Sequence, residues 1–161
     1  MVTLGHHGLA SKIVVMIIIA EAAGALGSLV TFPAISTWYS ALIKPPFSPP
    51  NFLFGPVWTM LYALMGIAAG LIWNSKSKKK SQALKIYGFQ LALNVLWSMV
   101  FFGLRSPFFA FVEIAFLWIS IAWTMIEFKK ISRNAFYIMV PYIVWVSIAL
   151  VLNISIVLLN P

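Results

Sequence analysis

Five long apolar runs, separated by short polar segments, dominate the pattern of hydrophobic and polar positions along this chain. The runs cover residues 12–32, 52–74, 84–104, 108–128 and 135–159. A helix needs about 20 apolar residues, at a rise of 1.5 Å each, to cross the hydrocarbon core of a bilayer. Each run therefore predicts one transmembrane helix. Together they predict an all-α integral membrane protein with a single five-helix domain over residues 1–161.

The first run resembles a signal peptide, because a single lysine, Lys12, precedes it. The apolar core of a cleavable signal has only about 7–15 residues and ends at a pair of small residues that mark the cleavage site. The run after Lys12 is longer than that and lacks a clear small-x-small exit. We therefore expect it to be retained as the first transmembrane helix.

The amino-acid composition excludes a water-soluble globule. Hydrophobic residues make up 62% of the chain and charged residues 9%, whereas an average soluble domain has roughly 45–50% and about 25%. So much apolar surface needs lipid as its solvent. The chain also contains no cysteine, which excludes disulfides, thiolate metal ligands and cysteine nucleophiles.

The basic residues predict the orientation in the membrane. Nine of the eleven fall on one side of the five predicted helices, namely Lys12, Lys76, Lys78, Lys79, Lys80, Lys85, Lys129, Lys130 and Arg133. Only Lys44 and Arg105 fall on the other side. Because cytoplasmic loops carry an excess of Lys and Arg, we expect the N-terminus to be cytoplasmic and the C-terminus to be outside.

The net charge of +8 raises the question of an anionic partner. Nucleic acid is not expected, because the basic residues gather in short loops and do not form a stripe interleaved with exposed aromatic residues. The lysine cluster at 76–80 has two interpretations. It is either a solvated loop that sets the topology, which we favour, or a contact for anionic membrane lipid.

Three predicted helices each carry a stripe of aromatic and polar residues at helical spacing. The stripes are Trp58, Tyr62, Met65 and Ala69; Gln90, Asn94, Trp97 and Ser98; and Tyr142, Trp145, Ala149 and Asn153. Polar side chains in hydrocarbon usually face the bundle interior, and mid-span indoles have no headgroup to bond. The stripes predict an aromatic pocket for a large flat ligand. For any single residue, hydrogen bonding between helices or an interfacial aromatic belt is the simpler interpretation.

Glu21 lies near the middle of the first predicted helix, where an ionised carboxylate is costly. Two interpretations remain open: a functional polar handle for a proton or an ion, or a neutral carboxyl bonded to a neighbouring helix. The small residues Ala20, Gly24 and Ser28 lie on one face of the same helix. They predict close approach of another helix, either within the bundle or in a dimer.

The segment 33–51 is rich in proline. Each proline fixes its own φ and biases the preceding residue toward extended geometry. We therefore expect a stiff, non-helical strap over the outer mouth of the bundle, and its length exceeds that of a plain connector of about 2–8 residues. The interpretation we favour is a lid over a site, with a passive loop as the alternative. The lid residues are Tyr39, Lys44, Pro45, Phe47, Pro49 and Pro50.

The spacing of many of these residues resembles the tryptophan-rich sensory protein (TspO) or translocator protein family. The resemblance rests on Trp38-Tyr39, Leu42, Lys44-Pro45, Pro49-Pro50, Phe54, Pro56-Val57-Trp58, Leu61-Tyr62, Met65-Gly66, Gln90-Leu91, Asn94, Trp97-Ser98, Phe101-Phe102, Pro141-Tyr142, Trp145, Asn153 and Asn160. It covers essentially the whole chain, and so many spaced matches are more specific than any single motif.

The resemblance implies a five-helix protein, commonly dimeric, that binds porphyrins such as protoporphyrin IX beneath its first loop. Many members also bind synthetic isoquinoline carboxamides or benzodiazepines. The implied pocket tryptophans are Trp58 and Trp145, and some bacterial members are reported to use these positions in light-dependent porphyrin breakdown. The ligand-binding side chains expected from the stripes and the resemblance together are Trp38, Trp58, Tyr62, Asn94, Trp97, Tyr142 and Trp145.

Three features depart from the family pattern. Phe47 stands where the family usually has tryptophan, so a lid hydrogen bond is lost. The fifth run has no basic residue after Arg133, so the Tyr-to-Lys/Arg motif associated with cholesterol is missing and cholesterol is not an expected partner. An acid at the position of Glu21 is not typical of the family.

The leading functional hypothesis is a membrane receptor or carrier for porphyrins or similar flat apolar molecules. The alternatives are light-dependent porphyrin degradation, or a small transporter or channel that uses Glu21. Enzymatic turnover is the weaker hypothesis, because no nucleophile lies beside a base. No metal site is expected, because His6 and His7 are the only histidines and precede the first run. No cofactor is required beyond the porphyrin as ligand. We expect a homodimer in a prokaryotic cell membrane.

Overall fold

The computed structural model describes the backbone of residues 4–161 and the side chains from residue 8 onward. The helices are α1 (Leu4–Ile35), α2 (Trp38–Ala41), α3 (Asn51–Asn74), α4 (Lys80–Ser98) with the π-helical turn η1 (Met99–Gly103), α5 (Pro107–Lys129) and α6 (Arg133–Leu159). Five of them, counting α4 and η1 as one, are long and apolar enough to cross a membrane. The predicted five-helix membrane fold is confirmed.

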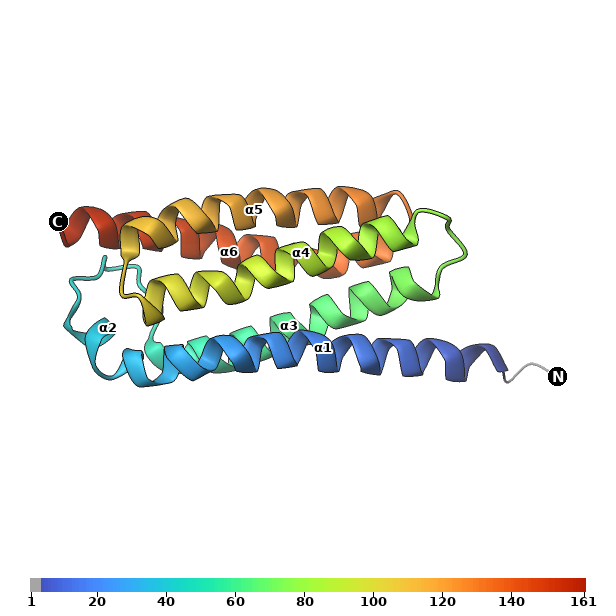
Figure 1. Cartoon of the computed structure of the whole chain (residues 1–161), viewed down its shortest axis with the longest axis horizontal. Coiled ribbons are helices and arrows are strands. Elements are labelled where there is room, and N and C mark those ends of the chain that lie inside the picture. The colour runs from blue at the N-terminus through green and yellow to red at the C-terminus, as the bar shows by residue number, and fades with distance from the viewer. Residues whose placement is uncertain (1–3) are drawn as a thin grey trace.

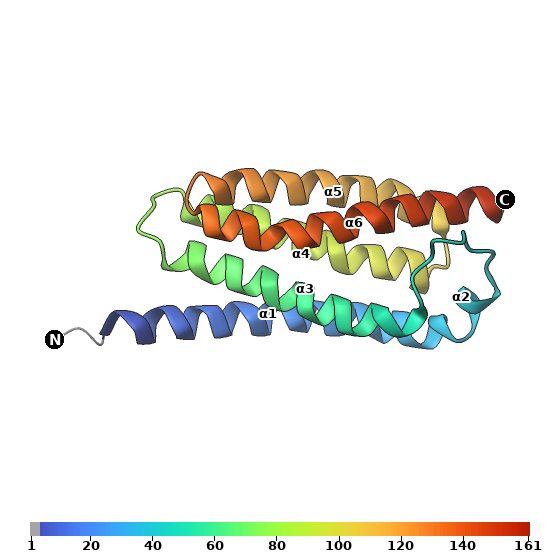
Figure 2. The same ribbon diagram turned by 180° about the vertical axis from the view of Figure 1, so that it is seen from behind.

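The long helices form an elongated bundle in which α1 and α5 lie on opposite sides (Figure 1). Neighbouring helices contact one another in the circular order α1, α3, α6, α5 and α4, and α4 closes the ring against α1. The described N-terminal end and the C-terminus lie at opposite ends of the bundle, as the view from behind also shows (Figure 2). This ring encloses the buried core. Helix α1 is part of the ring, but most of its residues are not buried.

Local sequence signals account for several helix boundaries. Helix α5 begins at Pro107, where the missing N–H of proline costs nothing because the first turn has no acceptor for it. Helix α6 begins after Ser132, whose hydroxyl accepts a hydrogen bond from the backbone N–H of Ala135 at 3.3 Å. The tight turn before α5 contains Arg105 at a φ of 54°, a left-handed conformation that reverses the chain in three residues.

Helix α1 is longer than the predicted 12–32, because a helix is not limited to the hydrocarbon layer. It includes Pro33, which we assigned to the loop, but it ends two residues later. The backbone of His6 and His7, expected in a tail ahead of the first span, belongs to α1, and their side chains lie outside the described part of the chain.

The loop is also not wholly extended as expected. Residues 38–41 form the single helical turn α2, because no proline lies between Pro33 and Pro45 to prevent it. The longer non-helical part of the loop therefore runs from the end of this turn to Asn51, where α3 starts, and a shorter one, residues 36–37, precedes the turn.

Helices α1 and α3 approach each other closely through glycines of α3. A Cβ atom added to Gly66 would lie 2.4 Å from the Cα of Ile17, and one added to Gly70 would lie 2.6 Å from the Cα of Ile13. On α1, a Cβ added to Gly24 would lie 2.4 Å from the ring of Tyr62. Small residues thus serve helix packing inside the chain, as they commonly do in membrane bundles.

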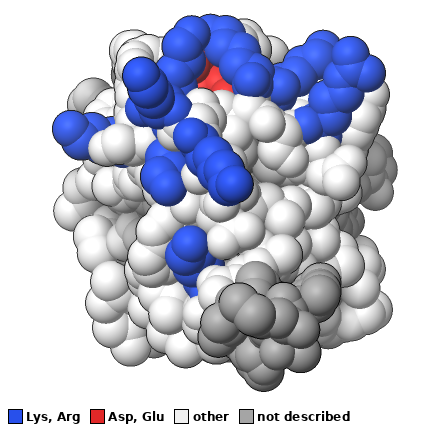
Figure 3. All heavy atoms as spheres, turned by 90° about the vertical axis from the view of Figure 1, so that its right-hand side faces the viewer, with Lys and Arg blue, Asp and Glu red and all other residues white. Residues whose placement is uncertain are grey.

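Lysine and arginine side chains gather on the end of the molecule that carries the described start of α1 (Figure 3). This end also contains the α3–α4 connection, with its lysine cluster, and the α5–α6 connection. There Lys130 forms an ion pair with Glu127, close to the end of α5. The charge asymmetry found in the sequence is therefore an asymmetry between the two ends of the bundle.

Replacing Gly66 by alanine is expected to destabilise the bundle, because the added methyl group meets the backbone of α1 and not a movable side chain. Overpacking of this kind costs about 1–3 kcal/mol. The measurement is the unfolding midpoint in detergent. The matched control is Gly88→Ala on α4, where an added Cβ has nothing within 4 Å; it is expected to be neutral or slightly stabilising. Equal stability of both variants would contradict this account of the α1–α3 contact.

Candidate functional site

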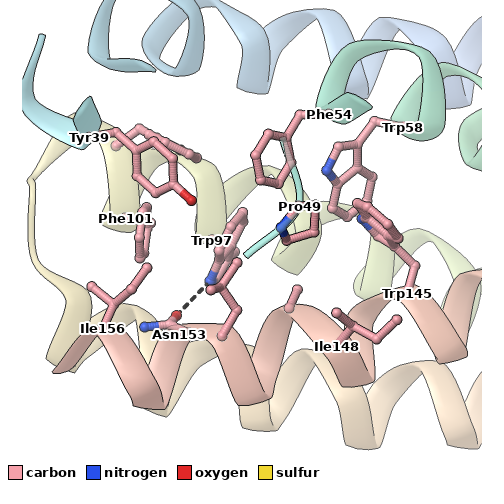
Figure 4. A pocket seen from close by; sticks show the side chains of 13 residues that line it. Tyr39, Pro49, Phe54, Trp58, Trp97, Phe101, Trp145, Ile148, Asn153 and Ile156 are labelled. Carbon is pink, nitrogen blue, oxygen red and sulfur yellow. Dashed lines mark hydrogen bonds between the residues drawn. The ribbon is translucent and has the colours of Figure 1, made fainter. Parts of the chain in front are cut away.

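A cavity lined mostly by aromatic side chains lies beneath the loop, at the end of the bundle opposite the basic residues (Figure 4). Its lining comes from α2, the loop and three of the long helices: Tyr39, Pro49, Phe54, Trp58, Trp97, Phe101, Phe102, Trp145, Ile148, Ala149, Leu152, Asn153 and Ile156. The cavity volume is about 30 Å³, room for only one or two water molecules. The side chains that form the walls are thus in place, but they leave almost no empty space between them.

The aromatic rings that line this cavity pack against each other in a continuous layer. Trp97 stacks on Phe101, with ring centroids 5.2 Å apart and an interplanar angle of 24°. Phe54 meets Trp145 edge to face at 6.4 Å. Offset-stacked and edge-to-face pairs are the favourable geometries for aromatic rings. The same rings can offer flat apolar faces to a ligand.

Trp97 is fixed by a hydrogen bond that crosses from α4 to α6. Its indole Nε1–H donates to the Oδ1 of Asn153 at 3.1 Å (Figure 4). The amide nitrogen of Asn153 donates in turn to the backbone carbonyl of Pro107 at 2.8 Å, at the start of α5. One buried amide therefore sets the position of the indole and joins three helices.

A second group of polar side chains forms a continuous hydrogen-bonded chain in the core. The Tyr62 hydroxyl donates to the Oδ1 of Asn94, and the amide nitrogen of Asn94 donates to the Tyr142 hydroxyl at 2.8 Å. Tyr142 donates to the Oε1 of Gln90 at 2.9 Å, and the Gln90 amide nitrogen contacts the Met65 sulfur at 3.8 Å. These contacts connect α3, α4 and α6 and satisfy the polar groups where water is absent.

The predicted ligand-binding residues therefore fall into separate groups. Trp58, Trp97 and Trp145 meet at the cavity beneath the loop. Asn94 and Tyr142 are buried in the hydrogen-bonded chain and do not line this cavity, so their contact with ligand stays a prediction. Trp38 does not line it either; it packs edge to face on Phe101 at 5.5 Å.

Phe54, Phe101 and Asn153 line the cavity although they were not among the predicted site residues. In a chain this apolar, a phenylalanine that faces the interior has no sequence signal that separates it from one that faces lipid. Asn153 did carry a signal, because it falls on the polar stripe of the last helix. The sequence shows the spacing of Asn153 from Trp145 on one helix, but it does not show the hydrogen bond to Trp97, which lies on another helix.

The loop is fastened at two points, one on α6 and one on α2. Asn160 accepts a hydrogen bond from the Ile43 N–H at 3.0 Å and donates to the Ile43 carbonyl at 2.9 Å. The Lys44 ammonium donates to the carbonyls of Tyr39 and Leu42, at 2.8 and 3.0 Å, and lies 4.8 Å from the Tyr39 ring centroid. Both contacts keep the loop across the end of the bundle.

The loop residues expected to form a lid differ in where they lie. Pro45 is buried and Pro49 lines the cavity, whereas Phe47 is 52% exposed and Pro50 is also exposed, at the start of α3. Tyr39 is buried beneath the loop, and its hydroxyl points toward the cavity (Figure 4). Burial raises the pKa of this hydroxyl, and a neighbouring Ser48 lowers it by less, so Tyr39 is a neutral donor at physiological pH.

A second, larger cavity lies between α1 and α3 and has a volume of about 270 Å³. Phe54, Trp58, Trp97 and Phe102 line both cavities, so a single layer of rings separates them. Its remaining lining, from α1, α3 and α4, includes Glu21 and Tyr62.

Five membrane-length helices around a tryptophan-lined cavity, covered by a fastened loop, define a small integral membrane protein with an aromatic cavity at one end. The family model that matches residues 15–159 is the TspO/MBR family, and the chain belongs to this family. It is 42% identical to the tryptophan-rich protein TspO of Chlorobaculum tepidum, over 87% of this chain and 90% of that protein. It is 40% identical to the TspO of Archaeoglobus fulgidus, over 92% and 97%. It is 34% identical to the human translocator protein, over 72% and 70%.

Replacing Tyr142 by phenylalanine is expected to lower stability by about 1–2 kcal/mol, because it leaves the buried amides of Asn94 and Gln90 each short of a partner. The measurement is the free energy of unfolding in detergent. Tyr137→Phe is the matched control, since Tyr137 is 64% exposed. If both variants unfold alike, the hydrogen-bonded chain contributes nothing measurable.

Replacing Asn160 by alanine is expected to loosen the loop, because it removes both bonds to the Ile43 backbone. Hydrogen exchange of a peptide covering residues 38–50 should then become at least several-fold faster, while exchange in α5 stays unchanged. Asn134→Ala, at an exposed position near the start of α6, serves as the control. Unchanged exchange in the loop would show that Asn160 does not hold it.

Proposed function

We propose that this protein is a membrane receptor or carrier for flat apolar ligands of the porphyrin class, bound in the aromatic cavity beneath the loop. The observation that carries the proposal is the convergence of Trp58, Trp97 and Trp145, from three different helices, on one cavity. Indoles placed this way offer broad apolar faces to a planar molecule. The family assignment supports the same class of ligand.

Two polar groups at the cavity would orient such a ligand. Tyr39 presents a neutral hydroxyl, and Asn153 presents an amide that is already bonded to Trp97. A few positioned polar groups within an apolar lining are typical of small-molecule sites. No resident cofactor is needed, because the porphyrin is itself the ligand.

Binding of a tetrapyrrole requires the cavity to open, since its volume of about 30 Å³ is far below the ~300–1,000 Å³ of ligand pockets. The loop contacts of Asn160 and Lys44 are the ones that must loosen. Rotation of the shared rings of Phe54 and Trp58 would add space from the cavity between α1 and α3. The proposal is therefore of a site that opens for its ligand.

The proposal includes an orientation and a membrane. The excess of basic residues at one end of the bundle supports a cytoplasmic N-terminus and an outer C-terminus, with the aromatic cavity toward the outside. The bacterial and archaeal relatives support a prokaryotic cell membrane. A homodimer belongs to the proposal through the family resemblance.

Titration with protoporphyrin IX tests the proposed site. In nanodiscs, the tryptophan fluorescence of the wild-type protein is expected to fall in a saturable way. Trp58→Leu combined with Trp145→Leu should weaken binding by about tenfold or more, because two aromatic contacts of about 0.5–1.5 kcal/mol each are lost.

The matched control is Trp123→Leu, at an indole that is 50% exposed and lines neither cavity; it should bind porphyrin like the wild type. Circular dichroism checks that all variants keep their helical content. Linear quenching of the wild type, as in partitioning into empty nanodiscs, would overturn the proposal. So would an unchanged affinity of the double variant.

A further inference from the structure

The cavity between α1 and α3 opens on the outer face of the bundle. Its lining includes a carboxylic acid, Glu21, from the middle of a membrane-spanning helix. Exposed residues of both helices line it, including Ala25 and Phe32 of α1 and Thr59 of α3. Glu21 also lines it and stands midway along the apolar span Gly8–Ile35. At a rise of 1.5 Å per residue, the carboxyl group is roughly 20 Å from either end of this span.

The side chains around Glu21 leave its carboxyl group without a partner. Among the described residues that line the cavity, Glu21 and Tyr62 are the only ones with a titratable side chain, so no lysine or arginine faces the acid there. The Tyr62 hydroxyl donates its hydrogen bond to Asn94 and not to Glu21. Carboxyl groups inside a membrane are normally paired, because unpaired ones are costly.

Three of the hydroxyl groups that line the cavity are also engaged elsewhere. Ser28 donates to the carbonyl of Ala25 at 2.7 Å, Thr31 to that of Gly27 at 2.9 Å and Thr59 to that of Gly55 at 3.1 Å. Each of these three hydroxyl protons therefore bonds to its own helix and not to Glu21. A ligand from outside the chain can supply the partner that Glu21 lacks.

We propose that this cavity binds a compact lipophilic amine whose ammonium group pairs with the carboxylate of Glu21. The amine enters from the lipid in its neutral form. The carboxyl proton of Glu21 then moves to the amine nitrogen, which leaves a carboxylate and an ammonium ion in contact. A charge-assisted hydrogen bond of this kind is about twice as strong as a neutral one, and low polarity strengthens it further.

The depth and size of the cavity define the ligand. The amino group of a phospholipid stays in the headgroup layer, so it cannot reach a carboxyl group in the middle of the span. The volume of about 270 Å³ is just below the ~300–1,000 Å³ of typical ligand pockets and fits a single ring with a short chain. Phe32 and Trp58 provide the apolar wall, and the indole can also face the ammonium group.

This site is distinct from the proposed porphyrin site, although the two share a wall of rings. Glu21 lines only the cavity between α1 and α3, and Trp145 lines only the cavity beneath the loop. Substitutions at these two residues therefore separate the two proposals. Failure of either proposal leaves the other testable.

The test uses 4-(4-fluorophenyl)butylamine as the probe and 4-(4-fluorophenyl)butanol as its neutral counterpart, both followed by ¹⁹F NMR in nanodiscs without porphyrin. The amine is expected to bind the wild-type protein saturably and at least tenfold more tightly than the alcohol. Glu21→Gln should remove this preference. Ala25→Phe should block both molecules by filling the cavity while leaving the acid in place.

Two control variants should bind the amine like the wild-type protein. Glu127→Gln removes a carboxyl group that pairs with Lys130 near the end of α5, and Trp145→Leu alters only the cavity beneath the loop. The proposal is overturned if Glu21→Gln keeps wild-type affinity for the amine. It is equally overturned if the alcohol binds as tightly as the amine, or if the wild-type signal only tracks partitioning into empty nanodiscs.

Discussion

The packing of α3, α4 and α6 depends on satisfying one group of polar side chains internally, in a region where no water can do so. Asn94 is the centre of this arrangement, because it accepts from Tyr62 and donates to Tyr142. These bonds tie together the helices that would otherwise meet through apolar contacts no stronger than those with lipid. They also fix which faces of α3, α4 and α6 point inward, and thereby where the tryptophans of the same helices lie.

The arrangement of the aromatic site follows from this constraint. Trp58 precedes Tyr62 by one helical turn, and Trp145 follows Tyr142 by nearly one turn, so the hydrogen-bonded tyrosines direct the indoles toward the end of the bundle that the loop covers. Closer to the loop, Asn153 plays the same part as Asn94: its side-chain amide joins helices by hydrogen bonds, here to Trp97 and to the start of α5. The loop contacts of Lys44 and Asn160 then close the end. Polar bonds below and a loop held by few contacts above would suit the large ligand that we propose.

The two cavities differ in how their polar groups are used. Beneath the loop, Asn153 is bonded within the chain, and the lining is otherwise dominated by aromatic and aliphatic side chains. Between α1 and α3, the hydroxyl groups of Ser28, Thr31 and Thr59 bond to their own helices, and Glu21 is left facing the space. α1 packs chiefly on α3 and exposes much of its length, so it is the helix on which an unpaired acid is reachable from the lipid.

The sequence by itself determined the five spans, since length and hydropathy decide whether a helix can cross a bilayer whatever its neighbours are. It also determined which helices carry the tryptophans, because helical spacing puts Trp58 with Tyr62, and Trp145 with Tyr142, on one face. Only the tertiary structure decided that Asn94 and Tyr142 bond to one another, that Phe54, Phe101 and Asn153 complete the wall, and that Glu21 opens on a cavity. Periodicity describes one helix at a time, whereas these contacts depend on how five helices are rotated and shifted against each other.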